Sequence, residues 1–157
     1  MDNKVVFAGN KGPRIKNDCF ISMQLKDVGG IQIQLNSKVG ILYGTKIETL
    51  CKNVLDHFGV KNVAVVIDDT GAYDFVITAR MEACIHQLIK TNTKYLPELI
   101  PENEYASSRD RMRFSRLYIP GNTPGMMINA GIYNAHGIIL DLEDSGAPEK
   151  KDEARLL

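Results

Sequence analysis

Hydrophobic and polar residues alternate on both sides of a glycine pair near the N-terminus. Residues 21–25 alternate before Gly29 and Gly30, and residues 31–35 alternate after them. Period-two alternation is typical of a strand with one buried face, and a short glycine-rich turn joins two such strands into a hairpin. The pattern therefore predicts a β-hairpin across residues 21–35.

The next segment takes up the three- and four-residue spacing of a helix. Apolar residues recur in this way from Ile47 to Phe58, which predicts an amphipathic helix. Thr45 and Glu48 have the spacing of a capping box and indicate its start. Gly59 supplies a C-terminal stop.

One more strand and one more helix complete the first half of the chain. Residues 62–67 are apolar and β-branched, as in a buried strand, and residues 68–71 have turn composition. A helix is expected at 72–90. These elements predict a small α+β domain at residues 1–92, followed by a polar, proline-containing linker at 93–112 with a short helix near 96–100.

The last third predicts a strand, a helix, a second strand and a final charged helix. A β-α-β order is how a (β/α)8 barrel begins, but a closed barrel needs roughly 250 residues and the chain has 157. We therefore expect residues 113–157 to be the first β-α-β of a truncated (β/α)8 barrel. Its elements are expected at 114–119, 124–134, 137–142 and 148–157.

Composition narrows the class of protein. The formal net charge is zero, so no overall field favours nucleic acid. No apolar run reaches the roughly 20 residues of a membrane helix, and the N-terminus does not look like a secretory signal. The cysteines Cys19, Cys51 and Cys84 are widely spaced, which favours reduced core thiols. We expect a cytoplasmic protein that binds neither nucleic acid nor membrane.

Acidic residues follow the last predicted strand. Asp141, Glu143 and Asp144 place three carboxylates within four positions, and such a set can bind a hard cation. The alternative is a solvated acidic loop before the final helix. These three residues are the candidate metal ligands.

Phosphate or thioester contact is a second candidate chemistry. Gly121 and Asn122 lie in a turn that leads into a helix, where backbone N–H groups can face a phosphate. Arg113 could pair with the same group. The alternative is a plain turn beside a solvated linker.

Charged residues also flank the predicted 72–90 helix. Asp68, Asp69 and Asp74 are interpreted as turn formers that favour the helix N-terminus. Arg80 and Glu82 are expected to form ion pairs with these acids or with a partner.

Two blocks of sequence carry a family resemblance. The run from Asp68 to Ala83, with residues 5–9 upstream, resembles the acyl carrier (gamma) subunit of bacterial citrate lyase. The run from Arg113 to Asp144 resembles the opening of the citrate lyase beta subunit, in the aldolase and citrate lyase barrel family. The order of the two blocks suggests a fusion of neighbouring subunits.

The first resemblance implies a serine shortly after Ala8-Gly9 that holds a coenzyme A-type prosthetic arm. No serine or threonine occurs from Asn10 to Asp18, and a phosphodiester needs a hydroxyl oxygen. The nearest hydroxyl, that of Ser22, lies in a predicted strand. We therefore expect that Gly9–Asp18 lacks the serine and that the chain carries no prosthetic arm. The alternative is an attachment site elsewhere in the chain.

The second resemblance implies a carbon–carbon lyase that cleaves a 3-hydroxy-acyl thioester by retro-aldol or retro-Claisen chemistry. In the family, the catalytic residues and magnesium ligands come from later strands, so no catalytic residue is assigned here. Mg²⁺ is expected for a full-length lyase, and this chain alone is expected to be inactive. Other citrate lyase-type subunits, or a second copy of the chain, are the expected partners.

Two alternatives to a lyase fragment stay open: a docking or scaffold module, and an acyl carrier subunit of a citrate lyase complex. We also expect residues 113–157 to pack poorly, because two strands alone expose their sheet edges. Limited proteolysis would then leave a core near residues 1–95.

Overall fold

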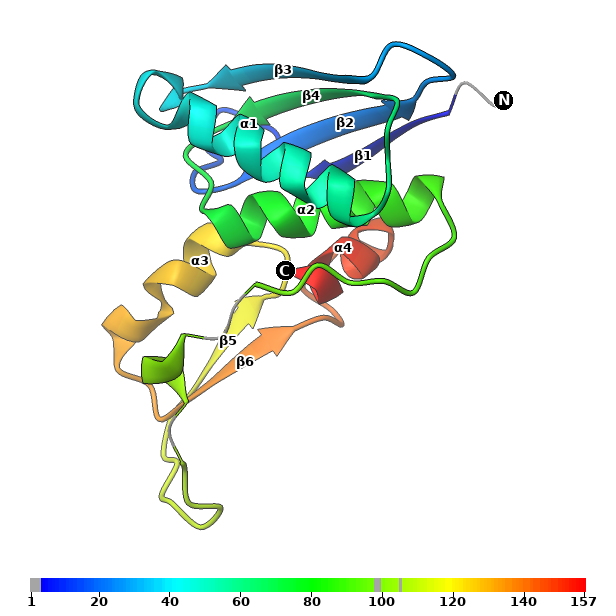
Figure 1. The fold of residues 1–157 in the computed structure, drawn as a ribbon. Helices are drawn as coiled ribbons and strands as arrows, with labels where there is room; N and C mark the ends of the chain where they lie inside the picture. The colour runs from blue at the N-terminus through cyan, green and yellow to red at the C-terminus, as the bar shows by residue number, and fades with distance from the viewer. Residues whose placement is uncertain (1–3, 98–99, 105) are drawn as a thin grey trace.

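A four-stranded sheet with two helices on one face forms the N-terminal half of the chain (Figure 1). The structure, a computed structural model, describes residues 4–97, 100–104 and 106–157. The strands are β1 (Val5–Gly9), β2 (Cys19–Leu25), β3 (Ile31–Ser37) and β4 (Val63–Asp69), and the helices are α1 (Gly40–His57) and α2 (Asp74–Leu88). The small α+β domain is therefore confirmed.

The strand order is β1-β2-β4-β3, so the predicted hairpin is wrong. β2 and β3 lie where the alternation places them, but β4 separates them; it pairs antiparallel with β2 and parallel with β3. Val63, Val65 and Ile67 of β4 are fully buried, whereas the apolar residues of β3 are only partly buried. The more apolar strand takes the centre, and β3-α1-β4 forms a parallel crossover.

The edge strand β1 was not predicted. Its residues alternate over only five positions, and Val5 and Phe7 are exposed. Val6 and Ala8, by contrast, are buried in the core. A strand this short carries too few repeats for a period-two pattern to be recognised.

Helix α1 begins at Gly40, not at Thr45. The Ser37 hydroxyl accepts the Val39 N–H at 3.0 Å just before the helix, while Thr45 lies in its second turn. Apolar residues of the first turn, such as Ile41, are exposed, so this turn lacks the amphipathic pattern that marks the rest. The predicted stop is confirmed, because Gly59 has a φ of 69°.

Strand β4 continues through Asp69, two residues beyond the predicted end, so the turn is shorter than expected. The Asp69 carboxylate is buried and accepts the backbone N–H groups of Gly71 and Ala72 at 2.9 and 2.7 Å. This arrangement closes the turn into α2. The predicted 72–90 helix is confirmed over Asp74–Leu88.

The C-terminal half is a partial β-α-β. Strand β5 (Arg116–Pro120) pairs parallel with β6 (Gly137–Asp141), and α3 (Pro124–Asn129) connects them through a 3₁₀ turn at Ala130–Tyr133. A 3₁₀ turn at Pro148–Lys150 leads into α4 (Lys151–Leu156). The expected helix at 124–134 thus changes to 3₁₀ geometry at Ala130.

The connecting segment carries one short 3₁₀ turn, Pro101–Asn103. The helix expected near 96–100 falls partly on residues 98 and 99, which lie outside the described residues. Leu96, Pro97 and Ile100 have no helical assignment. No helix in the described part of the chain is long and apolar enough to cross a membrane.

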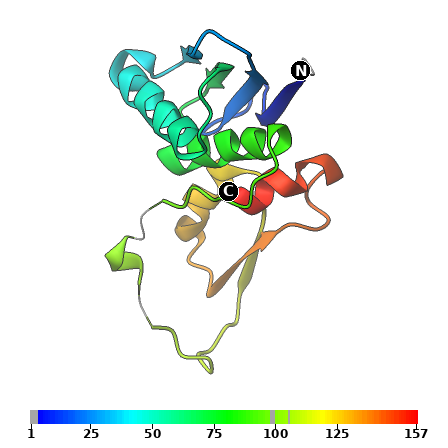
Figure 2. The ribbon, with the colours of Figure 1, turned by 45° about the vertical axis from the view of Figure 1, so that its right-hand side comes forward.

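The two halves are in contact, but the β5–β6 strand pair itself is poorly packed, in keeping with the expectation: Tyr118, Ile138 and Leu140 are exposed. Helix α4 contacts α2, and the carboxyl ends of β5 and β6 point toward α2 (Figures 1 and 2). Helix α2 therefore lies between the sheet and α4, and its residues from Val76 to Ile85 are all buried. The halves therefore meet at one end of the β5–β6 strand pair, while neither strand is buried along its length.

Candidate functional site

Arg80 stands at the centre of the contact between the two halves. Its side chain is fully buried, and it donates from Nε to Asp18 Oδ1 at 3.1 Å and from Nη2 to Asp18 Oδ2 at 3.0 Å. Asp18 is 1% exposed. A buried bidentate pair of this kind is stable only when both charges are satisfied by further hydrogen bonds.

Two residues of the C-terminal half supply these further contacts. Arg80 Nη1 donates to Asn122 Oδ1, and Asn122 Nδ2 donates to Glu153 Oε1 at 2.7 Å. Glu153 Oε1 also lies 3.5 Å from Arg80 and 3.2 Å from Lys150. We call Asp18, Arg80, Asn122, Lys150 and Glu153 the docking cluster. Its two acids and two bases compensate one another.

The docking cluster also forms hydrogen bonds to the start of the loop between β1 and β2. Gly9 N–H donates to Glu153 Oε2 at 2.9 Å, and Lys150 Nζ donates to the Gly9 carbonyl at 2.8 Å. Asn10 Nδ2 donates to Asp18 Oδ2 and to the Asn122 carbonyl, both at 2.8 Å. The start of this loop is therefore held by the C-terminal half, and its end, at Asp18, is held by Arg80.

The loop lies at the carboxyl end of the C-terminal strands. Asn122 lies two residues beyond the end of β5, and the neighbouring Gly121 N–H donates to the Asp141 carbonyl at the end of β6. A Cβ built on Gly125 would lie 3.2 Å from the Lys16 carbonyl oxygen. Barrel enzymes place their active sites at this end of the strands.

The candidate metal ligands are held within their own turn. Asp141 Oδ1 accepts the Glu143 N–H at 2.8 Å and Oδ2 accepts the Ser145 N–H at 3.1 Å. These bonds, the one from Glu143 first, hold the pKa of the Asp141 carboxyl below its ordinary value. Among the described residues, no three acidic, histidine or cysteine side chains gather where a metal ion could bind. The carboxylates Asp141, Glu143 and Asp144 therefore do not fit a magnesium site by themselves.

The candidate phosphate contacts are not brought together. Arg113 turns back on its own loop and donates to the Arg109 and Ser108 carbonyls at 2.9 and 3.4 Å. Gly121 is in close contact with β6, since an added Cβ would lie 2.8 Å from the Asp141 carbonyl oxygen. Asn122 is 9% exposed and engaged in the docking cluster. Of these three residues, only Asn122 belongs to the site.

The partners expected for Arg80 and Glu82 are different from those observed. Asp68 pairs with Lys11 at 2.6 Å and Asp74 pairs with Lys46 at 2.7 Å, so neither reaches Arg80. Glu82 Oε2 accepts the Tyr95 N–H at 3.0 Å. The Lys11 hydrogen bond, followed by that of Asn36, lowers the pKa of the Asp68 carboxyl.

Sequence reasoning missed Asp18 and Glu153 as members of the site. Asp18 directly precedes an alternating strand, which marks it only as a polar boundary residue. Glu153 lies in a short charged segment that is typical of a solvated helix. Asp18 lies 62 positions before Arg80 in the chain, and Glu153 lies 73 positions after it. No local sequence pattern signals contacts over such separations.

All three cysteines are free and buried, as expected of core thiols. Burial raises the pKa of the Cys51 and Cys84 thiols to about 12, and it raises that of Cys19 well above its ordinary value. The thiols are therefore protonated in the folded chain near neutral pH.

Comparison with known families accounts for both halves. The family model described as malonate decarboxylase delta subunit, an acyl carrier family, matches residues 7–88, which is more than half of the chain. The chain belongs to this acyl carrier family. The HpcH/HpaI aldolase/citrate lyase family matches residues 115–157. The carrier-family domain is thus followed by an aldolase-like segment.

Individual relatives agree with this division. The citrate lyase acyl carrier protein of Fusobacterium nucleatum subsp. nucleatum is 30% identical over 84 residues, covering 54% of this chain and 89% of that protein. The citrate lyase acyl carrier protein of Streptococcus mutans is 35% identical over 71 residues, covering 45% and 70%. The resemblance to the citrate lyase carrier is confirmed.

The aldolase-like segment matches a much longer relative. The citrate lyase subunit beta of Leuconostoc mesenteroides subsp. cremoris is 42% identical over 50 residues, covering 32% of this chain. The match spans only 17% of that subunit. No solved structure matches the chain.

Proposed function

We propose that this chain is a docking unit of a citrate lyase-type assembly, in which a carrier-family domain without a covalent arm holds the first β-α-β of the lyase. The observation that carries the proposal is the burial of Arg80 between Asp18 of the carrier-family domain and Asn122 and Glu153 of the aldolase-like segment. The proposed division is a domain at 1–92, a linker at 93–112 and a segment at 113–157.

The loop from Gly9 to Asp18 supports a domain that carries no arm. It contains no hydroxyl side chain. Nearby hydroxyls are engaged: the Thr70 hydroxyl donates to the Asp18 carbonyl at 2.7 Å. Ser22 lies within β2, opposite Phe7 of β1 and Val66 of β4. Neither Thr70 nor Ser22 lies on a free loop from which a long arm could extend. A relocated attachment site is therefore disfavoured.

The lyase context supplies the proposed chemistry. A complete lyase of this type would cleave a 3-hydroxy-acyl thioester by retro-aldol or retro-Claisen chemistry with Mg²⁺. The described residues form one partial β-α-β without a metal-binding group, so we propose that this chain alone does not turn over such a substrate. Other citrate lyase-type subunits are its proposed partners.

Hydrogen exchange tests the docking role. In the full chain, Asn122→Ala should speed amide exchange in both α4 and the loop from Gly9 to Asp18, because Asn122 links Arg80 to Glu153. The matched control is Asn129→Ala, since among the described residues the Asn129 side chain donates to the Gly125 carbonyl of its own helix and to no other group. Unchanged exchange in both regions of Asn122→Ala would overturn the docking role.

Intact-mass spectrometry of the chain from its native host tests the absence of an arm. The expected mass is that of the unmodified polypeptide. A covalent coenzyme A-derived adduct would instead establish an acyl carrier. Turnover of citryl- or malyl-coenzyme A by the purified chain with Mg²⁺ would show that it is an active lyase.

A further inference from the structure

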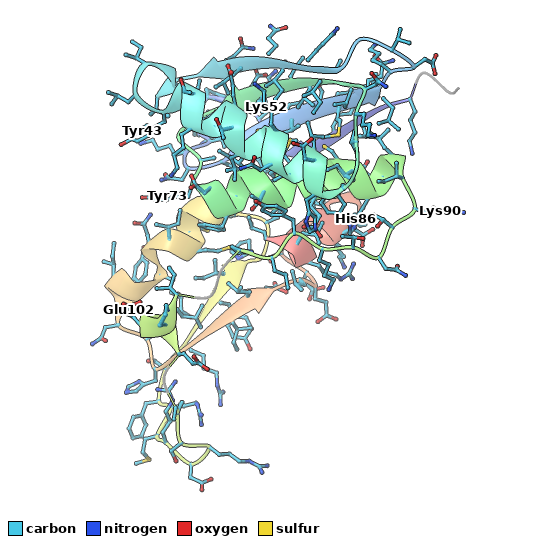
Figure 3. The ribbon with its side chains drawn as sticks, in the orientation of Figure 1. Tyr43, Lys52, Tyr73, His86, Lys90 and Glu102 are labelled. Carbon is cyan, nitrogen blue, oxygen red and sulfur yellow. The ribbon has the colours of Figure 1, made fainter. Side chains whose placement is uncertain are left out.

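Two histidines hold the backbone of the connecting segment just after it leaves α2. His86, in the last turn of α2, lies with Nε2 3.1 Å from the Thr93 carbonyl oxygen. His57, the last residue of α1, lies with Nε2 3.0 Å from the Lys94 carbonyl oxygen. Figure 3 shows His86 on the side of α2 along which the connecting segment passes. Two consecutive carbonyls of one segment are thus bound from the ends of two helices.

These contacts fix the nitrogen on which each ring carries its hydrogen. A carbonyl oxygen can only accept, so Nε2 is the donor in both histidines, and Nδ1 of each neutral ring is left without a hydrogen. His57 is exposed, and the His86 side chain is 28% exposed, so both rings are open to solvent. Each ring can therefore take up a second proton at Nδ1 and keep its contact with the segment.

A buried carboxylate lies beside one of these rings. Glu82, one turn before His86 on α2, is buried, and its Oε2 accepts the Tyr95 N–H at 3.0 Å. Its Oε1 has no hydrogen-bond partner among the described residues and lies 3.6 Å from His86 Nε2. A buried carboxylate oxygen without a partner is unfavourable. A positive charge on the neighbouring imidazole would offset that cost.

We propose that His57, Glu82 and His86 form a proton-dependent clasp, which holds the connecting segment more tightly when His86 is protonated. The proton comes from solvent and binds Nδ1 of His86. The bond from Nε2 to the Thr93 carbonyl remains and becomes charge-assisted. The imidazolium also pairs with Glu82, which binds Tyr95 through its other oxygen. Histidine changes charge between about pH 5 and 8, so the clasp tightens on acidification and loosens as the pH rises.

The position of His86 in its helix also favours a positive charge, because the carboxyl end of a helix is the negative end of its dipole. Lys90 and Lys94 of the connecting segment oppose that charge, but both are exposed, so solvent and salt screen their repulsion. From α1, the titratable neighbour is His57, and the Phe58 ring lies edge-on to both histidines.

Charged groups near β1 and α4 face His86 across a hollow. They are Lys4, Glu149, Lys150, Asp152, Glu153 and Arg155. Four of them are engaged with one another, as the pairs Lys150–Glu153 and Arg155–Asp152. Arg155 and Lys94 also line a second hollow with Glu82. Among the described residues, Glu82 is the acid that lies within ion-pair distance of His86.

The clasp goes beyond the docking role and can fail separately from it. None of its three residues belongs to the docking cluster. Asn122→Ala should therefore loosen docking and leave the pH response of the clasp unchanged.

Amide exchange of the full chain, measured by NMR at about pH 5.5 and about pH 7.5, tests the clasp on both sides of the histidine range. The Tyr95 amide is the direct reporter, because it is bonded to Glu82. Its protection factor, which corrects for the intrinsic effect of pH on exchange, should be about threefold to tenfold higher at the lower pH, as expected of a partly buried ion pair at a helix end.

Conservative variants identify the groups responsible. His86→Gln should abolish the pH response, because glutamine can donate to the Thr93 carbonyl but does not titrate. Glu82→Gln should abolish it too, since the amide oxygen can accept the Tyr95 N–H without a charge. His136→Gln, at a histidine of the C-terminal half, is the matched control and should keep the response. Equal protection factors at the two pH values in the wild type, or a response that survives in His86→Gln, would overturn the inference.

Discussion

At the residue scale, one guanidinium organises the contact between the two halves. Arg80 uses all three of its nitrogens: two on Asp18 and one on Asn122. Lys150 adds a second positive charge beside Glu153. The cluster is therefore neutral as a whole, while removal of one member leaves a buried charge without its partner.

Replacement of Arg80 should be strongly destabilising. In Arg80→Met the Asp18 carboxylate stays buried without its bidentate partner, and the expected loss in free energy of unfolding is about 3–5 kcal/mol. Urea denaturation of the full chain measures it. Arg155→Met is the matched control, because the Arg155–Asp152 pair is exposed and is worth about 1 kcal/mol or less. A loss as small as that of the control would refute the role given to Arg80.

Buried thiols give a second prediction at this scale. Because burial raises the pKa of the Cys51 and Cys84 thiols to about 12, the reactive thiolate is rare at pH 8 in the folded chain. A thiol-specific chromogenic reagent should react slowly with the native protein and rapidly with the denatured one. Rapid reaction of the native protein would show that these thiols are accessible.

At the scale of elements, the place of β1 beside β2 in the sheet and the last residue of β1 fix the start of the loop from Gly9 to Asp18. Gly9 has a φ of 94°, and a Cβ placed there would lie 1.9 Å from the Cys19 carbonyl oxygen of β2. Glycine is thus required for the chain to leave β1, and the same residue bonds to Lys150 and Glu153.

Gly9→Ala should therefore both strain the β1–β2 pair and displace the C-terminal half. We expect a loss of roughly 3 kcal/mol or more in free energy of unfolding, as for other severe backbone clashes. Gly131→Ala is the control, since a Cβ there meets nothing within 4 Å. Equal stability of the two variants would contradict the observed packing of β1 against β2.

Periodicity located three elements of the first half of the chain. The alternation of residues 21–25 and 31–35 marked β2 and β3, and the apolar stripe from Ile47 to Phe58 marked most of α1. Pairing was not predictable, because the competition of β3 and β4 for the place beside β2 depends on burial across the whole sheet. Of the candidate site residues, Asn122 was found for its turn chemistry, whereas its contact with Arg80 is set by tertiary packing.

At the scale of the whole molecule, the carrier-family domain covers the carboxyl ends of β5 and β6 (Figure 1). Its contact is made by a polar cluster that is compensated in charge and by Leu156 of α4, which packs against the core of the carrier-family domain. The segment around Arg109, Arg111 and Arg113 is exposed. The two halves should therefore stay together even when the chain between them is cut.

Limited trypsin digestion followed by native mass spectrometry tests this central claim most directly. Cleavage at Arg109, Arg111 or Arg113 should give two fragments that remain in one complex, and the complex should dissociate when the same digestion is applied to Arg80→Met. Separation of the wild-type fragments, with a stable core near residues 1–95 alone, would contradict the account.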